Sequence, residues 1–271
     1  MAAPRVGVVT LQIARPPIHR DRFGRPYIVP PEGGKAVPYT RATTWADTLD
    51  DRWNLEQWKM RQVAVGLADR PDLVLAVTTQ RDDKQALNFT VQAAMEAAKS
   101  SAAATRGTAL HTLTELLDLG QPRPTIPSDV TADLKAYEAA TKHLEMSHVE
   151  EFVVVDELQV AGTFDRLVRH EGRVKVADLK TGGSVKYAMG AIALQLALYS
   201  RGVAYDHVTG TRTPLPDVDQ NEALVIHLPA GLGICTLLRV DIRLGWEAVL
   251  LAGRVRKFRA YAKSGALADQ I

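Results

Sequence analysis

Two aspartates and a lysine lie on either side of a glycine-containing turn, and their spacing suggests metal chemistry. If Glu171-Gly172 forms a two-residue hairpin loop, Asp165 on the first strand lies opposite Asp178 on the second. Directly opposed Cβ atoms of an antiparallel pair are about 5 Å apart on the same face of the sheet. Lys180, two residues beyond Asp178, projects from that face as well, because side chains alternate along a strand.

Facing carboxylates destabilise a sheet unless something neutralises them. A bound divalent cation would do so, and carboxylate oxygens are ligands that Mg²⁺ and Mn²⁺ prefer. A one-residue slip would place Asp165 opposite Ala177 and weaken this interpretation. The alternative is a surface hairpin with scattered charges. The run Val-Lys-Val-Ala-Asp-Leu-Lys around Asp178 favours a partly buried strand and therefore a site.

The elements around this hairpin predict an α/β (α+β) fold with a mixed central sheet flanked by helices. Period-two alternation and β-branched residues predict the strands, and apolar runs with helix-forming residues predict the helices. The predicted strands are Glu151–Val155, Gln159–Val168, Arg173–Leu179, Glu222–Leu228 and Cys235–Ile242, and the helices among and after them are Ala188–Arg201 and Leu244–Ala262.

The first part of the chain is predicted to be an arm followed by helices. Residues 1–40 are rich in proline, glycine and basic side chains, and 21–26 is typical of a turn. Helical sequence runs from about Thr44 to Leu119, including a long alanine-rich helix, Asp83–Ala104, with an interruption at Arg106-Gly107-Thr108. A further helix is predicted over Ser128–Ser147. The domains are therefore predicted as 1–104, an arm and helical region, and 105–271, the core.

Composition excludes several classes of protein. Of the 271 residues, 46% are hydrophobic and 24% are charged, which is typical of a globular chain and not of a disordered one. The single cysteine, Cys235, excludes a disulfide framework and a cysteine-ligated cluster. No apolar stretch approaches the roughly 20 residues that cross a bilayer, so a cytoplasmic protein without membrane contact is expected. A net charge of +2 neither requires nor excludes nucleic acid.

Four short motifs resemble the PD-(D/E)XK nuclease superfamily. Two are Gly162-Thr163-Phe164-Asp165 and Val176-Ala177-Asp178-Leu179-Lys180-Thr181-Gly182, which match its core motif. The others are Arg106-Gly107-Thr108-Ala109-Leu110-His111 and Gln195-Leu196-Ala197-Leu198-Tyr199, which resemble those of the RecB-like and CRISPR-associated RecB-like exonuclease branch. Each motif alone is a loose match, but four in the correct order and spacing over about residues 105–201 are specific. The resemblance implies a restriction-endonuclease-like core behind a helical N-terminal region.

The resemblance also implies roles for individual residues. Asp165 and Asp178 would coordinate Mg²⁺ or Mn²⁺, with His111 as a nitrogen ligand and the backbone carbonyl of Leu179 as a further one. Lys180 would orient the attacking water or stabilise negative charge. The remaining two, Gln195 and Tyr199, would support the site or contact the DNA backbone. His111 and Glu115 share one helical face, and the sequence leaves Glu115 open between a partner of the site and a solvated charge.

Relatives in this branch often hold an iron–sulfur cluster, which one cysteine cannot ligate. The chain also has no G-x-x-x-x-G-K-[ST] loop, so it resembles a cluster-free, stand-alone member of the kind that phages encode beside recombination and repair functions. The expected activity is metal-dependent exonuclease cleavage of single-stranded DNA or duplex ends. A recombinase or annealing protein is the candidate partner, and a homo-oligomer is an expected state.

Two alternatives remain at this point, besides a different metal hydrolase on the same acidic hairpin, which has no support beyond the carboxylates. One is an endonuclease of the same superfamily, such as a junction resolvase or a restriction-like enzyme, with the same chemistry on a different DNA-binding surface. The other is a catalytically inactive DNA-binding or assembly module, against which the intact Asp165, Asp178 and Lys180 count. The basic residues of the arm and of the last helix, among them Arg254 and Lys257, fit either phosphate contacts or a solvated face.

Overall fold

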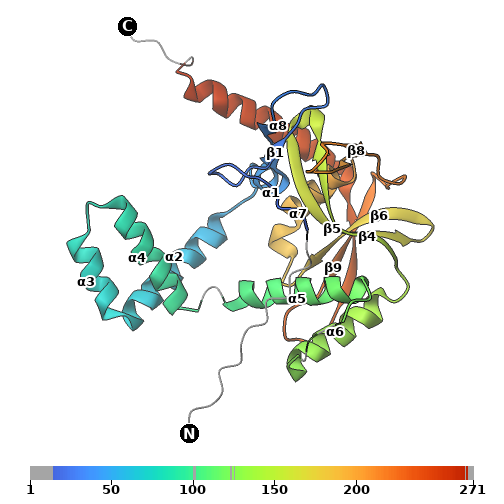
Figure 1. The fold of residues 1–271 in the computed structure, drawn as a ribbon. Helices are drawn as coiled ribbons and strands as arrows, with labels where there is room; N and C mark the ends of the chain where they lie inside the picture. Colours follow the sequence, from blue (N-terminus) through green and yellow to red (C-terminus); the bar gives the residue numbers. More distant parts are fainter. Residues whose placement is uncertain (1–14, 100–101, 123, 125, 266, 268–271) are drawn as a thin grey trace.

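The structure is a computed structural model that describes residues 15–99, 102–122, 124, 126–265 and 267. Its centre is an eight-stranded mixed sheet with strand order β10-β9-β6-β5-β4-β7-β8, and β3 pairs with β5 at one end (Figure 1). Pairing is antiparallel except for β6 with β9 and β3 with β5, which are parallel. The strands are β3 (Thr40–Arg41), β4 (Glu145–Val155), β5 (Val160–His170), β6 (Arg173–Lys180), β7 (Val203–Tyr205), β8 (Arg212–Thr213), β9 (Glu222–His227) and β10 (Thr236–Asp241).

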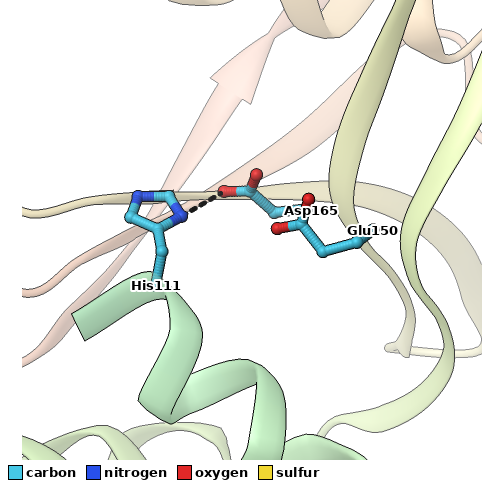
Figure 2. Close-up of side chains that lie close together, drawn as sticks. All are labelled: His111, Glu150 and Asp165. Atoms are coloured by element: carbon cyan, nitrogen blue, oxygen red, sulfur yellow. Dashed lines mark ion pairs between the residues drawn. The ribbon is translucent and has the colours of Figure 1, made fainter. Parts of the chain in front are cut away.

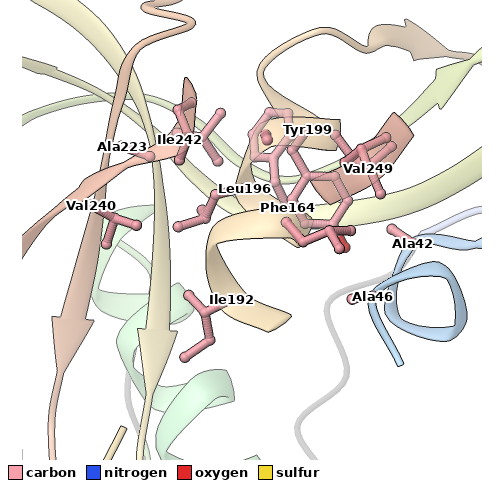
Figure 3. Packing of buried hydrophobic residues seen from close by; sticks show 14 of the residues in the cluster. Ala42, Ala46, Phe164, Ile192, Leu196, Tyr199, Ala223, Val240, Ile242 and Val249 are labelled. Carbon is pink, nitrogen blue, oxygen red and sulfur yellow. The ribbon is translucent and has the colours of Figure 1, made fainter. Parts of the chain in front are cut away.

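Helices cover both faces of this sheet. On one face, α7 (Met189–Tyr199), α8 (Ile242–Lys263) and α1 (Ala42–Ala46) bury a cluster that includes Phe164 and Val249 (Figure 3). On the other face, α5 (Ala102–Asp118) and α6 (Ser128–Thr141) pack Leu110 and Tyr137 against Leu179. Full burial of one such side chain contributes roughly 1.5–3 kcal/mol of transfer free energy. The predicted α/β fold, with a mixed sheet flanked by helices, is confirmed.

Three helices stand apart from the sheet (Figure 1). They are α2 (Trp53–Asp69), α3 (Pro71–Thr79) and α4 (Lys84–Ala97), and they pack mainly on one another. Close packing of α2 on α4 depends on Gly66, because a Cβ there would lie 1.8 Å from the carbonyl oxygen of Ala94. The predicted domain boundary at residue 104 lies inside α5 and stays a prediction.

The N-terminal arm lies beside the sheet. Its described part contains a short antiparallel pair, β1 (Tyr27–Ile28) with β2 (Val37–Pro38). Gly24 ends the predicted turn with a φ of 73° and an amide hydrogen bond to the carbonyl of Asp21. Ile28 is completely buried in a third apolar cluster with Phe152 and Tyr205. The arm is therefore packed on the body over these residues, and its first fourteen lie outside the described residues.

The helix predictions need three corrections. The predicted helix Asp83–Ala104 is too long, because α4 ends at Ala97 and α5 begins at Ala102. The predicted interruption at Arg106-Gly107-Thr108 is wrong, because α5 runs through it. Gly107 serves close packing instead: a Cβ there would lie 2.6 Å from Thr181 Oγ1 in the loop after β6. The predicted helix over Ser128–Ser147 is also too long, since α6 ends at Thr141 and β4 begins at Glu145. Within the described residues, no helix has the length and apolar character needed to cross a membrane.

Candidate metal centre

His111, Glu150 and Asp165 come together beside the middle of β4 and β5 (Figure 2). Each offers one ligand atom, and these atoms all lie within 4.8 Å of one another. His111 comes from α5, Glu150 from β4 and Asp165 from β5. His111 Nδ1 lies 3.6 Å from Asp165 Oδ2. Three elements distant in sequence thus converge on a single small space.

Irregular backbone in β4 and β5 directs the two carboxylates toward α5. Consecutive residues of a regular strand point to opposite faces, yet Asp165 faces His111 while Arg166 reaches Thr114 and Asp118 on the same helix. On β4, Glu150 has a φ of 55°, a left-handed conformation that is uncommon for a residue with a side chain. Such local distortion of a sheet typically re-aims side chains at functional sites.

The predicted hairpin register is confirmed from His170↔Arg173 to Arg166↔Ala177, with Glu171 and Gly172 in the turn at positive φ. The pairing ends there, so Asp165 and Asp178 are not a paired couple in the ladder. The carboxylate of Asp165 instead accepts the backbone N–H of Leu179, at 2.7 Å. The distortion at Asp165 and Arg166 explains why the ladder ends. The N–H of Leu179 donates to the side chain of Asp165 in place of a backbone carbonyl of β5.

Burial and mutual repulsion raise the pKa values of the carboxyl groups. Burial, and then the charge of Asp165, raise the pKa of Glu150 to about 7. Burial raises the pKa of Asp165, against the attraction of Arg166 and the Leu179 hydrogen bond. The pKa of His111 is lowered to about 4 by burial and then by the charge of Arg166. His111 is therefore a neutral imidazole at pH 7, the form that ligates metals.

Asp178 and Lys180 lie on β6 next to this group. Asp178 is buried, its carboxylate Oδ2 is 2.6 Å from Lys180 Nζ, and it is not one of the three residues within 4.8 Å. Burial, followed by the charge of Asp165, raises the pKa of Asp178 to about 6. The Lys180 side chain is 29% exposed.

Helix α7 supplies the predicted Gln195 and Tyr199. Gln195 Nε2 donates a hydrogen bond to Tyr199 Oη at 2.9 Å, and Tyr199 is buried. Burial raises the pKa of Tyr199, and the charges of Asp178, Asp165 and Glu150 raise it further. Gly162 makes room for the ring, because a Cβ there would lie 2.9 Å from two Tyr199 atoms. The structure thus places this pair behind the carboxylates and not among them.

The group opens into a cavity of about 860 Å³ between α5 and two loops. One of these loops, Pro229–Gly233, is held by Asp133, a completely buried residue of α6. Its carboxylate accepts the N–H groups of Gly231 and Gly233 at 2.7 and 2.8 Å. A second cavity of about 630 Å³ adjoins the first, and Glu150 lines both.

The arm reaches this cavity through one ion pair. Arg15, which lines the second cavity, pairs with Glu115, which lines the first. Glu115 is buried on the same face of α5 as His111. The ion pair with the arm is the contact that the structure gives this residue, whose role the sequence had left open.

The donor set fits a divalent cation. An imidazole and two carboxylates provide mixed nitrogen and oxygen ligands, which suit Mn²⁺ and, with water completing the shell, Mg²⁺. Burial disfavours negative charge at this place and raises the pKa values of Glu150 and Asp165. A bound cation would remove that cost.

Sequence analysis missed Glu150 and Asp133. Glu150 stands opposite Asp165 in the β4–β5 register, between the pairs Val149↔Arg166 and Glu151↔Phe164. A signal for it was present, since extending the predicted strand back from Glu151 and pairing it across the connection at Asp156–Gln159 would have put an acid there. Asp133 gave no signal, because only the tertiary fold brings α6 beside a distant glycine loop.

Comparison with known proteins gives a match over part of the chain. No curated protein matches it. The family model of the PD-(D/E)XK nuclease superfamily does match, over residues 126–220. That segment contains Glu150, Asp165, Asp178 and Lys180, whereas His111 lies before it. Residues 126–220 therefore have the sequence pattern of the PD-(D/E)XK nucleases, and this segment supplies the carboxylates and the lysine of the candidate centre.

Proposed function

We propose that the chain is a metal-dependent deoxyribonuclease that hydrolyses phosphodiester bonds at DNA ends. The observation that carries this proposal is the convergence of His111, Glu150 and Asp165 within 4.8 Å at the wall of an 860 Å³ cavity. The match to the nuclease superfamily over residues 126–220 supports the same activity. Mg²⁺ or Mn²⁺ is the proposed metal.

The residues divide into three roles. His111, Glu150 and Asp165 would hold the cation, with Asp178 and the Leu179 carbonyl as further ligands. When bound, a divalent cation acidifies water and polarises a phosphodiester. Lys180, whose Nζ is fixed beside Asp178 and whose side chain is partly exposed, would stabilise negative charge on the phosphate oxygens. The hydrogen bond between Gln195 and Tyr199 would brace the strands from the α7 side.

Exonuclease action is the finer part of the proposal. Two adjoining cavities share Glu150, so a single strand could enter one and leave by the other past the ligand group. The RecB-like branch is proposed from the motifs around His111 and around Gln195-Tyr199. A phage-type role in recombination or repair, beside a recombinase or annealing protein, rests on the same resemblance.

The test is cleavage of end-labelled DNA. Linear single- and double-stranded DNA, labelled at either the 5′ or the 3′ end, and a covalently closed circle are incubated with the protein in Mg²⁺, Mn²⁺ or EDTA. We expect metal-dependent loss of linear DNA only, and the product ladder gives the polarity. Cutting of the circle would assign an endonuclease, and DNA binding without cleavage in either metal would leave a binding module.

Two variants control for a contaminating nuclease. Asp178→Asn keeps the shape of a side chain predicted at the centre and should lose cleavage. Asp217→Asn alters an acid that lines a separate cavity with Arg173 and Pro216, and it should cleave like the wild type. Equal activity of all three proteins in one purification scheme would identify a contaminant.

A further inference from the structure

Arg166 is the largest completely buried side chain in the described part of the molecule. It follows Asp165 directly on β5, and no predicted site role included it. Its Nε donates to Asp118 Oδ2 at 2.8 Å, and its Nη2 donates to Thr114 Oγ1, also at 2.8 Å. Both partners belong to α5, the helix that carries His111. One guanidinium group therefore joins the strand of Asp165 to the helix of His111.

The contact extends to a third element. Tyr137 of α6 donates its hydroxyl hydrogen to the same Asp118 oxygen at 2.8 Å, and the guanidinium carbon lies 5.7 Å from the centre of the Tyr137 ring. Asp118, Tyr137 and Arg166 thus form one buried polar network between β5, α5 and α6. Buried networks of this kind hold a specific geometry when their members are satisfied, because a lost partner leaves a costly unpaired group.

The third nitrogen of the guanidinium group, Nη1, lies near Asp165. Among the described residues, Nη1 has no hydrogen-bond partner, and it lies 3.9 Å from Asp165 Oδ2. At that distance the attraction is electrostatic and no hydrogen bond forms. The hydrogen bonds to Asp118 and Thr114 hold the guanidinium group at this distance from the carboxylate of Asp165. The carboxylate of Asp165 is therefore stabilised by a nearby cation without losing an oxygen lone pair to it.

We propose that Arg166 is a positioning residue of the metal centre, clamped by Asp118 and Thr114 so that it sets the spacing between Asp165 and His111. The proposal rests on the proposed metal-dependent function. Arg166 itself touches neither substrate nor cation, because its side chain is completely buried. It acts by fixing two ligands that come from different elements, which is the role that partners of metal ligands commonly have.

The structure offers a matched pair of variants for the test. Thr114→Val removes the hydroxyl group that receives Nη2 of Arg166. Thr141→Val removes another buried threonine hydroxyl, on α6, which donates to the backbone carbonyl of Tyr137. Arg166→Lys keeps the charge but cannot reproduce the two-pronged contact with Asp118 and Thr114. Thermal unfolding of each variant shows that it is folded and gives its loss of stability.

The measurement is the affinity for Mn²⁺ alone, by titration calorimetry without DNA. Altered partners of metal ligands typically lower affinity about 10- to 100-fold. We expect a loss in that range for Arg166→Lys and a smaller one for Thr114→Val, with wild-type affinity for Thr141→Val. The Mn²⁺ concentration for half-maximal cleavage should rise in parallel, while the rate at saturating Mn²⁺ stays close to that of the wild type.

The outcomes separate this inference from the proposed function. Wild-type Mn²⁺ affinity in Arg166→Lys and Thr114→Val, with metal-dependent cleavage by the wild type, overturns the role of Arg166 alone. Equal losses of Mn²⁺ affinity in Thr114→Val and Thr141→Val also overturn the role of Arg166. The losses would then reflect the lower stability of both variants. A rate that stays low at saturating Mn²⁺ in a folded variant contradicts positioning through the metal. A wild-type protein that binds neither Mn²⁺ nor Mg²⁺ overturns both proposals.

Discussion

Near the turn of the β5–β6 hairpin, a buried lysine is fully matched by acids. Lys175 is 3% exposed and pairs with Glu222, and its Nζ is 3.9 Å from an oxygen of Glu171, which also pairs with Arg239. Farther along this hairpin, Asp165 has the carboxyl groups of Glu150 and Asp178 as neighbours, and the pKa values of Glu150 and Asp178 are raised to about 7 and about 6. The first region pairs its buried charge with acids, whereas the second keeps carboxyl groups with raised pKa values even beside Lys180 and Arg166.

This difference separates a structural ion network from a binding site within one hairpin. A buried charge is expensive unless it is paired, so evolution toward stability alone would favour the arrangement around Lys175. The strained φ of Glu150 points the same way, since backbone strain persists where the surrounding structure enforces it and tends to accumulate at functional sites. We therefore expect the two regions to differ in function as they do in charge.

The largest effect is expected from Asp165→Asn. This change removes a proposed ligand while keeping the size of the side chain and leaving an oxygen for the Leu179 N–H. Lewis-acid stabilisation contributes several kcal/mol to a transition state, so cleavage should fall at least about 100-fold. Initial rates on labelled linear DNA measure it. Retention of more than a tenth of the activity, with unchanged Mn²⁺ affinity, would remove Asp165 from the centre.

A smaller loss is expected from Glu150→Gln. The amide lacks the negative charge that attracts the cation, so Mn²⁺ affinity should fall about 10- to 100-fold, measured by calorimetry. The matched control is Glu151→Gln, one residue along β4, which is not in the ligand group. Equal behaviour of the two variants would mean that the charge of the strand matters and the position of Glu150 does not.

The pH dependence of stability should distinguish Glu150 without any metal. Its pKa is raised to about 7 in the folded protein from a usual 4.5, so folding favours the protonated form. The folded state is then destabilised as pH rises from about 4.5 through about 7, on the order of 3 kcal/mol in all. In EDTA, Glu150→Gln should therefore gain unfolding free energy relative to the wild type between pH 5 and pH 8.

Chemical denaturation at the two pH values measures this difference, and comparing the two proteins cancels the opposite contribution of His111. The pKa of His111 is lowered to about 4, so it destabilises the fold as pH falls below its usual 6.5. Saturating Mn²⁺ should remove the advantage of the variant at pH 8. A pH-independent difference between the proteins would show that Glu150 is ionised normally in the folded state.

The smallest effect on activity is expected from Lys175→Met, in the region whose charges are already paired. Loss of a charged hydrogen bond to Glu222 should cost about 1–3 kcal/mol of unfolding free energy. Mn²⁺ affinity and cleavage should stay within about twofold of the wild type, because the change lies outside the ligand group. Denaturation and calorimetry on one preparation provide both numbers. A large loss of Mn²⁺ affinity would mean that the two ends of the hairpin are coupled.

Much of the fold follows from local pattern. Alternation and β-branched residues correctly predicted the strands from Gln159 to Leu179, and the Glu171-Gly172 turn set their register as predicted. The wrong prediction of a helix break at Gly107 has a physical cause. Gly107 was interpreted as a break, but glycine inside a helix also permits close approach of another segment, here Thr181, and that distinction depends on the packing partner.

The sequence by itself determined which residue types could form a metal centre and placed His111, Asp165, Asp178 and Lys180 on their elements. Only the tertiary structure decided which of them meet. Distortion of β4 and β5 turns Glu150 and Asp165 toward His111, while Asp178 pairs with Lys180. The burial of Arg166 between β5, α5 and α6 was equally beyond the sequence. A strand pattern reports alternation alone, whereas bulges and buried networks arise from packing between distant segments.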